Sequence, residues 1–435
     1  MDPLALLGSL LRKTPAGESV ILELDLDFSI LSAPPGNPLE ALRAINSPTM
    51  RALREGLREA STDSDVLGLI VHLGTCPLTA TQTSELGQAL ESFGAAKPVW
   101  AYTESFAEIG TALLPYVLAT SASQIWLQES GQVGLGGVRA GITLLRGSFD
   151  KVGLEPEFSK RQEYKSAADS YSAHEISDAH REMIQRIADS ITATSVETIA
   201  RRRTLTTEQV WAAVDAGILR PAEAVERGLV DQIGYRDEVY AAARQEWQRD
   251  VHPARLRYLH RYAASGHAFE VVTQRTRPAI AVVGVRGGIV SGRPSPQGPG
   301  SQPTAVAEQI CQQLRAAGRD EHVKAVVLRV ESPGGSYIAS DSIRREVLNL
   351  KRTGRPVVAS MGDLAASGGY FVAMPATEIV ANPVTLTGSI GVFAGKFVTT
   401  ELKRKIGLVS EDVLAGAWAS FMSSNQKFTE EQWAS

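Results

Sequence analysis

The sequence predicts an α/β fold that consists of two tandem copies of one unit, and three observations lead to this prediction. Short apolar runs typical of buried parallel strands alternate with helical patterns along the chain. Several of these runs recur after a nearly constant separation of about 255 residues. One stretch of the first copy, 172–246, is rich in Ala, Arg, Glu and Ile and is typical of a helical insertion. Because strands that alternate with helices imply crossover connections, we expect a mostly parallel sheet in each copy.

The strands and turns of the first copy can be paired with segments of the second. The paired segments are 66–73 with 323–330, 97–101 with 355–359, 116–120 with 370–374, 134–138 with 388–392, and 151–154 with 405–408. Such a regular offset over several motifs is hard to obtain by chance. We therefore assign residues 1–265 to an N-terminal repeat and residues 266–435 to a C-terminal repeat. The second repeat ends before its own helical stretch, so we interpret it as truncated.

The composition is that of an ordinary globular protein and argues against several classes of function. Hydrophobic residues make up 43% of the 435-residue chain and charged residues 21%, which provides material for sizeable cores. The net charge of −4 argues against a nucleic-acid-binding protein, which usually carries a basic patch. Two cysteines, Cys76 and Cys311, are too few for a disulfide framework or a zinc site, and we expect both to be buried and inert. The seven histidines show no metal-binding spacing, so we expect neither a metal nor a cofactor.

The chain shows no segment typical of a transmembrane helix. No apolar run reaches the length of about 18 residues that such a helix requires. The opening segment, 1–13, is apolar but short, and it lacks the basic start of a signal peptide. We interpret this segment either as a helix that packs on its own domain or as a short interfacial helix that touches a membrane.

Two glycine-rich turns of the second copy carry residue types that acyl transfer requires. The first turn contains Gly334 and Gly335 after a predicted strand, where paired glycines leave backbone amides uncovered. The second contains Ser367 followed by Gly368 at the start of a helical pattern, where a hydroxyl lies beside free amides. Ser367 is therefore a candidate nucleophile, and the amides of both turns are candidate donors to an oxyanion. Taken singly, each turn also fits an ordinary strand-to-helix turn or a helix N-cap.

The first copy lacks these groups at the corresponding positions. Leu113 stands where the second copy has Ser367, and a Pro-Leu pair stands where it has the two glycines. Lys165 shows the reverse pattern, because the second copy has Ala419 at its position. One copy thus holds an amine and the other a hydroxyl, which predicts one composite site that needs both copies.

A serine hydroxyl is a weak nucleophile until a base takes its proton. Lys165 can be that base if desolvation lowers its pKa from about 10.4 toward neutrality. His174 and His180 lie near it in the sequence, but we expect them to face solvent on a helix. Ser389 occurs only in the serine-bearing copy, so it is either a hydrogen-bond partner for the amine or an ordinary turn serine.

Four ordered segments, 332–336, 365–370, 386–391 and 164–167, resemble the signature segments of the signal peptide peptidase A (protease IV) family in its long, duplicated bacterial form. The resemblance runs from residue 19 to the end of the chain. It implies a Clp-protease/crotonase-like fold of ββα superhelical repeats in each copy. It also implies the roles of five residues: Ser367 as nucleophile, Lys165 as general base, Ser389 as the partner of the lysine, and Gly335 and Gly368 as oxyanion donors.

The family digests signal peptides that remain in the membrane after secretion and prefers apolar cleavage sites with small residues. The resemblance therefore implies a serine endopeptidase with a Ser/Lys dyad that degrades signal-peptide remnants and other apolar or unfolded peptides. It also implies a homo-oligomer associated with the bacterial cytoplasmic membrane, with the membrane surface as a further partner. Two features depart from the long form: no N-terminal transmembrane anchor is visible, and the C-terminal end is missing.

Two other interpretations stay open. A crotonase-type acyl-CoA enzyme has a similar fold and oxyanion hole, although it does not need a separated serine and lysine, and no clear coenzyme A site is evident. An inactive scaffold that binds peptides or membrane proteins follows if the shortened second copy prevents catalysis. Peptide hydrolysis that depends on Ser367 and Lys165 separates the first interpretation from both.

Overall fold

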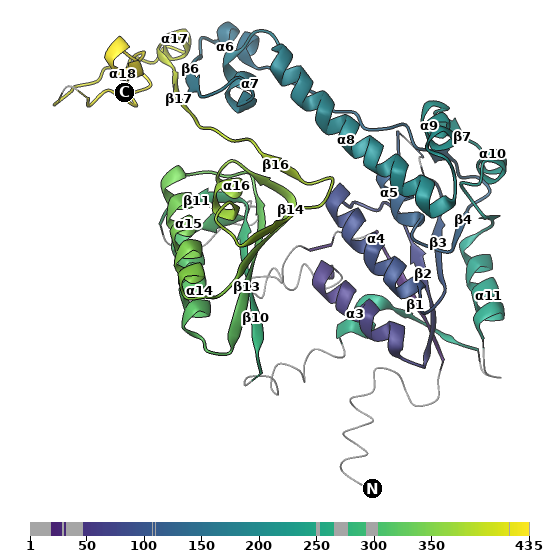
Figure 1. The fold of residues 1–435 in the computed structure, drawn as a ribbon. Coiled ribbons are helices and arrows are strands. Elements are labelled where there is room, and N and C mark those ends of the chain that lie inside the picture. The colour runs from purple at the N-terminus through teal and green to yellow at the C-terminus, as the bar shows by residue number, and fades with distance from the viewer. Residues whose placement is uncertain are drawn as a thin grey trace. The chain divides into compact units, whose positions relative to one another are not determined.

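The computed structural model describes residues 19–27, 30–31, 47–106, 108, 110–248, 253–264, 277–292, 303–416 and 418–434. The chain divides into two compact units (Figure 1). Unit 1 comprises Met1–Val138, Ser190–Ala279 and Asn382–Thr385, and unit 2 comprises Arg139–Asp189, Ile280–Ala381 and Leu386–Ser435. The segment that carries Lys165 therefore belongs to the same unit as Ser367 and Ser389.

Unit 1 is built on a parallel sheet with the strand order β8-β4-β3-β2-β1-β9. Its strands are β1 (Val20–Asp25), β2 (Val66–His72), β3 (Val99–Thr103), β4 (Gln124–Leu127), β8 (Gln232–Ile233) and β9 (Arg255–Tyr258), and a separate antiparallel pair is formed by β5 (Val133–Gly134) and β7 (Ile218–Leu219). Its helices are α3 (Met50–Thr62), α4 (Ala80–Gly94), α5 (Leu113–Ala119), α9 (Thr207–Asp215), α10 (Pro221–Glu226), α11 (Arg236–Trp247) and α12 (Leu259–Ala264), together with the second part of α8 (Asp178–Arg203). Strand β2 is buried along its whole length, as expected for a strand inside a parallel sheet with both faces covered.

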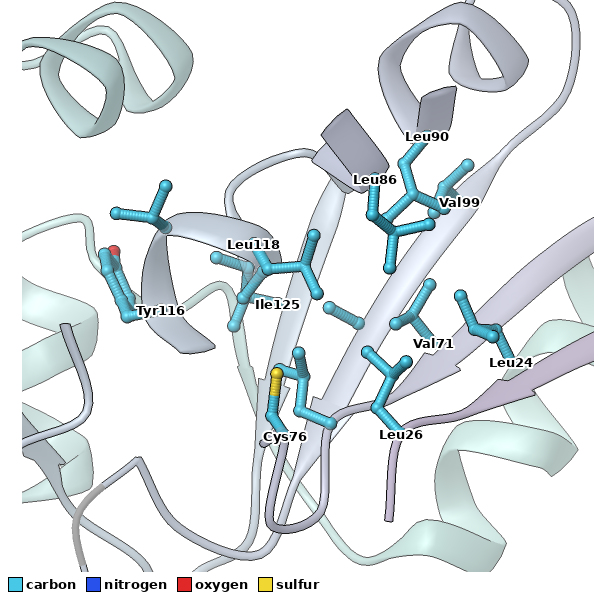
Figure 2. Packing of buried hydrophobic residues seen from close by; sticks show 14 of the residues in the cluster. Leu24, Leu26, Val71, Cys76, Leu86, Leu90, Val99, Tyr116, Leu118 and Ile125 are labelled. Carbon is cyan, nitrogen blue, oxygen red and sulfur yellow. The ribbon is translucent and has the colours of Figure 1, made fainter. Parts of the chain in front are cut away.

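Alternate residues of these strands point to opposite faces of the sheet, which gives unit 1 two cores. Figure 2 shows part of the larger core, where Leu24 and Val71 of the sheet pack with Leu86 of α4. On the other face, Trp100 packs against Trp247 of α11, with their ring centroids 4.7 Å apart. The sheet is therefore held between helices on both sides.

Unit 2 contains a sheet with the strand order β10-β13-β14-β15, and β16 pairs with the end of β14. The strands are β10 (Ala279–Arg286), β13 (Val323–Ser332), β14 (Val357–Ala366), β15 (Glu378–Val380) and β16 (Leu386–Gly388), with short pairs formed by β11 (Gly288–Val290) with β12 (Thr304–Val306) and by β6 (Glu155–Lys160) with β17 (Phe393–Val398). The helices are α6 (Arg146–Val152), the 3-10 turn η1 (Ser166–Ala168), α7 (Asp169–Ser172), α14 (Ala307–Arg319), α15 (Tyr337–Arg352), α16 (Gly368–Ala373), α17 (Thr400–Lys405) and α18 (Glu430–Ala434). Leu328 and Ala359 of the sheet pack with Leu314 of α14 and Ile343 of α15 to form its core.

The two units repeat one topology, which confirms the predicted tandem α/β fold. The order β4-β3-β2-β1 in unit 1 corresponds to β15-β14-β13-β10 in unit 2, strand by strand along the chain. The predicted insertion at 172–246 is largely helical and contains α8, α9, α10 and most of α11. The predicted boundary between the repeats, at residues 265 and 266, lies outside the described residues, as does the apolar segment 1–13. Within the described part of the chain, no helix combines the length and the apolar character needed to cross a bilayer.

Candidate active site

Ser367 lies between the end of β14 and the start of α16, in a turn with unusual backbone geometry. Its φ of 53° falls in the left-handed region that residues with a side chain rarely adopt. The turn is held by two backbone hydrogen bonds: the Ser367 amide donates to the Gly388 carbonyl at 2.8 Å, and the Phe371 amide donates to the Ser367 carbonyl at 2.9 Å. Strain of this kind persists only where the surrounding structure fixes it, and it is concentrated at functional sites.

Ser389 follows the neighbouring strand, so the two serines lie at the same edge of the sheet. Strand β16 runs parallel to the end of β14, with Ala366 opposite Gly388. The carboxyl ends of parallel strands meet at one edge, which places Ser367 and Ser389 side by side. Ser389 also has a positive φ, 48°, and it is flanked by Gly388 with a φ of 80°.

Lys165 reaches this edge from a loop that follows β6. Strand β6 pairs antiparallel with β17, and beyond the pair the amide of Arg161 donates to the carbonyl of Val392 at 3.1 Å. This pairing sets the Lys165 loop against the segment that begins with Ser389. Gly391 suits this approach, because its φ of 127° is one that residues with a side chain rarely adopt, and an added Cβ would lie 3.1 Å from the carbonyl oxygen of Arg161. Lys165 is only 3% exposed.

The three predicted side chains meet at the amine of Lys165. Its Nζ lies 3.0 Å from Ser367 Oγ, 3.0 Å from Ser389 Oγ and 2.5 Å from the carbonyl oxygen of Ser389. No carboxylate is among these partners, so nothing in the contact set favours the charged amine through an ion pair. Burial instead disfavours the charged form and lowers the pKa of Lys165 below its usual range.

The two predicted oxyanion amides, those of Gly335 and Gly368, are also adjacent. An added Cβ on Gly368 would lie 3.3 Å from the Gly335 nitrogen. Gly335 faces Ile289 of β11 in a parallel bridge. The Ile289 amide donates to the Gly334 carbonyl, and the Ser336 amide donates to the Ile289 carbonyl, so neither hydrogen bond uses the Gly335 amide. Within the described part of the chain, neither the Gly335 nor the Gly368 amide has a hydrogen-bond acceptor. Both amides are thus available to a ligand beside Ser367.

Two buried serines that the sequence did not single out pack against the glycine turns. Ser332 is fully buried; its hydroxyl donates to the Gly287 carbonyl at 2.7 Å and accepts from the Gly334 amide at 3.1 Å. Ser340 is also fully buried, and its Oγ lies 2.6 Å from the position that a Cβ on Gly368 would take. A serine two residues before a glycine turn is a recognised turn signal, so Ser332 was detectable, whereas nothing local distinguishes Ser340.

The prediction for the two nearby histidines is half correct. His174 is exposed and lies 3.4 Å from an oxygen of Asp150. His180 was expected to face solvent, but it is 6% exposed. His180 lies in the first turn of α8, and it is buried because of the side of the helix on which it stands. Its closeness to Lys165 in the sequence gives no information about that side. Neither histidine is among the partners of the Lys165 amine or of the Ser367 hydroxyl in the described residues.

Two further groups of titratable residues lie outside this site. Both cysteines are free and buried, as expected, and burial raises the pKa of Cys76 to about 12. In unit 1, Asp25, Asp27 and His72 offer potential metal-ligand atoms within 4.8 Å of one another. The two ring nitrogens of His72 lie 3.3 Å from Asp25 and 3.0 Å from Glu104. These residues come from different strand ends, so their spacing in the sequence gave no signal.

Comparison with known proteins identifies related sequences. A family model described as Peptidase family S49 matches residues 91–250 and 349–434, which together are more than half of the chain. The first matched region contains Lys165, and the second contains Ser367, Gly368 and Ser389, whereas Gly335 lies outside both. The match confirms the Clp-protease/crotonase-like fold class.

Curated relatives extend the similarity over most of the chain. The serine protease SPPA, chloroplastic, of Arabidopsis thaliana is 29% identical and covers 86% of this chain and 54% of its own length. Protease 4 of Salmonella typhi is 32% identical and covers 82% of this chain and 57% of its own length. The putative signal peptide peptidase SppA of Enterococcus faecium is 35% identical over 28% of this chain and 35% of its own length. The chain thus spans little more than half the length of the relatives that match it most extensively.

Proposed function

Because the chain belongs to peptidase family S49, we propose that it is a serine endopeptidase in which Ser367 is the nucleophile and Lys165 is the general base. In this proposal Ser389 orients the amine, and the amides of Gly335 and Gly368 bind the oxyanion. The observation that carries the proposal is the 3.0 Å separation between Ser367 Oγ and the Nζ of a lysine that is 3% exposed. A nucleophile and a base within hydrogen-bond distance are the signature of covalent catalysis by an activated hydroxyl.

The partners of Lys165 match the bonding capacity of a neutral amine. A neutral amine has two N–H donors and one lone pair. The carbonyl of Ser389 can only accept, so it takes one N–H, and Ser389 Oγ takes the second. In the ammonium form the third N–H donates to Ser367 Oγ, whereas in the neutral form the lone pair is left to accept the proton of the Ser367 hydroxyl. Burial of Lys165 lowers its pKa, which increases the fraction of the neutral form at a given pH.

The reaction follows from this arrangement. The proton of the Ser367 hydroxyl passes to Lys165 Nζ while Oγ bonds to the carbonyl carbon of the peptide. The negative charge that develops on the carbonyl oxygen is stabilised by two amide donors, each worth about 3 kcal/mol. The ammonium of Lys165 then gives its proton to the leaving amine, and the C–N bond breaks. The neutral amine then takes a proton from water, whose oxygen attacks the ester carbonyl. As the bond between the carbonyl carbon and Oγ breaks, the ammonium returns this proton to Oγ and restores the Ser367 hydroxyl.

We propose apolar or unfolded peptides as substrates, including the remnants of signal peptides. The segment that follows Ser389 presents exposed apolar side chains, namely Ile390, Val392 and Phe393. The segment that follows the Gly335 turn does the same with Tyr337 and Ile338. Apolar surface beside a catalytic site favours apolar ligands. A homo-oligomer and attachment to the surface of the cytoplasmic membrane complete the proposal.

The test is hydrolysis of a fluorogenic apolar peptide by the parent chain and by the variants Ser367→Ala and Lys165→Ala. Both variants are expected to lose turnover by at least about a thousandfold, as removal of a nucleophile or its base does in other serine peptidases. Matched controls are Ser342→Ala and Lys324→Ala, which replace an exposed serine and an exposed lysine of the same unit. Thermal unfolding shows whether each variant is folded.

The outcomes distinguish the proposal from its alternatives. Turnover by the parent and both controls, with two inactive but folded variants, supports the dyad. Equal turnover by Lys165→Ala removes Lys165 as the base. A parent chain that binds the peptide but never cleaves it indicates a scaffold.

A further inference from the structure

We propose that the ion pair between Lys160 and Asp169 positions the general base by closing the loop that carries it. Lys160 Nζ lies 2.7 Å from Asp169 Oδ2. The two residues stand at the two ends of the loop, and Lys165 lies between them. The inference rests on the proposed role of Lys165 and adds two positioning residues to that site.

Each end of the loop is attached to a fixed element. Lys160 is the last residue of β6 and pairs with Phe393 of β17. Asp169 opens helix α7, whose Tyr171 stacks on Phe158 of β6 with ring centroids 5.8 Å apart. The ion pair therefore joins a strand end to a helix start, and the segment between them forms a closed turn.

Two other hydrogen bonds hold the interior of the loop: the Arg161 amide donates to the Val392 carbonyl at 3.1 Å, and the Tyr164 hydroxyl donates to a carboxylate oxygen of Glu182 at 2.7 Å. Gln162 has a φ of 69°, in the left-handed region, and the Lys165 amide donates to the Gln162 carbonyl at a long 3.3 Å. Lys160 adds a further long contact from the end of the loop, because its Nζ donates to the Glu163 carbonyl at 3.4 Å. The Lys160 ammonium thus contacts both Asp169, at the far end of the loop, and Glu163, in its middle.

The burial of the pair separates it from an ordinary surface ion pair. The side chain of Asp169 is 11% exposed and that of Lys160 is 29% exposed. Exposed pairs contribute little because water screens them, whereas a buried carboxylate that loses its partner is strongly disfavoured. Since proton transfer requires a short distance between Lys165 Nζ and Ser367 Oγ, even a small displacement of the loop should reduce the rate.

The experiment compares Asp169→Asn, Lys160→Met and the double variant in the full chain, with kcat and KM measured separately on the apolar peptide. We expect each single variant to lower kcat by at least about tenfold, because the base is misplaced, while KM changes less than about twofold. The double variant should lose no more than either single variant, because the two residues act as one unit. Glu155→Gln, which breaks the ion pair with Lys427 at the other end of β6, is the matched control and should keep the parental kcat.

The pH profile gives a readout that a merely structural role would not move. Asp169→Asn leaves the Lys160 ammonium without its counter-charge in the same loop as Lys165, which should shift the acid limb of kcat/KM to lower pH. Lys160→Met leaves the Asp169 carboxylate unpaired, which should shift the same limb to higher pH. The other charged residues of the loop, Arg161 and Glu163, are unchanged in both variants.

The failure of this inference can be told apart from failure of the dyad. If Lys165→Ala is inactive while Asp169→Asn and Lys160→Met keep the parental kcat and acid limb, the positioning role is wrong and the dyad stands. If Lys165→Ala keeps parental turnover, both proposals fail. Should either single variant unfold, the double variant decides the question, because it removes the pair without leaving either charge unpaired.

Discussion

Lys165 Nζ and Ser367 Oγ lie 3.0 Å apart although 202 residues separate them in the chain. Their meeting depends on two pairings: β16 places Ser389 beside Ser367, and the β6–β17 pair brings the Lys165 loop against the segment after Ser389. Segment 139–189 of the first repeat therefore folds as part of unit 2, where the serine is. The proposed site is composite in sequence and contained within one compact unit.

The pH dependence of peptide hydrolysis should report the titration of Lys165. The amine accepts the Ser367 proton only when it is neutral, so kcat/KM should rise with pH through the pKa of Lys165. Because burial lowers that pKa, the rise should fall below the range of about 10.4 that is typical of lysine. Measurement of kcat/KM between about pH 6 and about pH 10 checks this. An acid limb at the ordinary lysine value would contradict the expected desolvation.

The same burial should make the stability of the fold depend on pH. Between the lowered pKa of folded Lys165 and its ordinary value, the unfolded chain binds more protons than the folded chain. The free energy of unfolding therefore rises with pH across that window and falls as pH decreases through it. Lys165→Met should remove this dependence and stabilise the fold at neutral pH. Thermal unfolding at about pH 7 and about pH 10 tests it, and a variant that loses stability at the lower pH would contradict the argument.

Much of the fold could be predicted because it is encoded in local patterns. The apolar run 66–73 forms the fully buried strand β2, and the run 323–330 forms β13, in which buried residues alternate with partly exposed ones. The constant offset between the two runs corresponds to a repeated strand order. Comparison of the two copies also singled out Lys165 and Ser367, since each is absent from the other copy. These signals depend on composition and spacing, which a sequence displays directly.

The remaining features arise from tertiary contacts. Ser340 packs beside Gly368 from a helix that is distant in sequence, and Lys160 and Asp169 form their ion pair only because the chain between them folds into a loop. The burial of His180 is decided by which side of α8 is covered. Neither periodicity nor spacing carries that information, because each depends on segments brought together by folding.

Loss of the Ser389 hydroxyl should slow catalysis without abolishing it. Ser389→Ala removes one partner of Lys165 Nζ at 3.0 Å and keeps the carbonyl partner. A hydrogen bond of this kind contributes about 1–2 kcal/mol, so kcat should fall about tenfold. Since Ser389 has a φ of 48°, Ser389→Gly is the control for backbone strain. Equal losses in both variants implicate the hydroxyl, whereas a loss confined to the alanine variant implicates the backbone.

A methyl group at Gly368 should damage the proposed oxyanion site. The added Cβ in Gly368→Ala would lie 2.6 Å from Ser340 Oγ and 3.3 Å from the Gly335 nitrogen. Ser340 and the Gly335 turn must both move to make room for the methyl group, which displaces the proposed oxyanion amides. We therefore expect kcat to fall about a hundredfold, the loss typical for one oxyanion donor. Adding Ser340→Ala removes the closer contact and should recover part of the loss. A double variant no better than Gly368→Ala would show that the backbone contacts, 3.2 Å to Gly334 Cα and 3.3 Å to the Gly335 nitrogen, dominate.

Removal of the Ser332 hydroxyl should weaken both the fold and the proposed oxyanion turn. In Ser332→Ala, the half-buried Gly287 carbonyl and the buried Gly334 amide lose the partner that the fully buried serine provides. An unsatisfied buried group costs about 1–3 kcal/mol, so the free energy of unfolding should fall by about 2–4 kcal/mol. Denaturant unfolding measures that loss, and Ser332→Thr, which keeps the hydroxyl, separates the lost hydrogen bonds from altered packing. Because the Gly334 turn sets the direction of the Gly335 amide, kcat should fall in the alanine variant even under conditions where it is fully folded. Parental kcat in folded Ser332→Ala would show that the turn holds its shape without this serine.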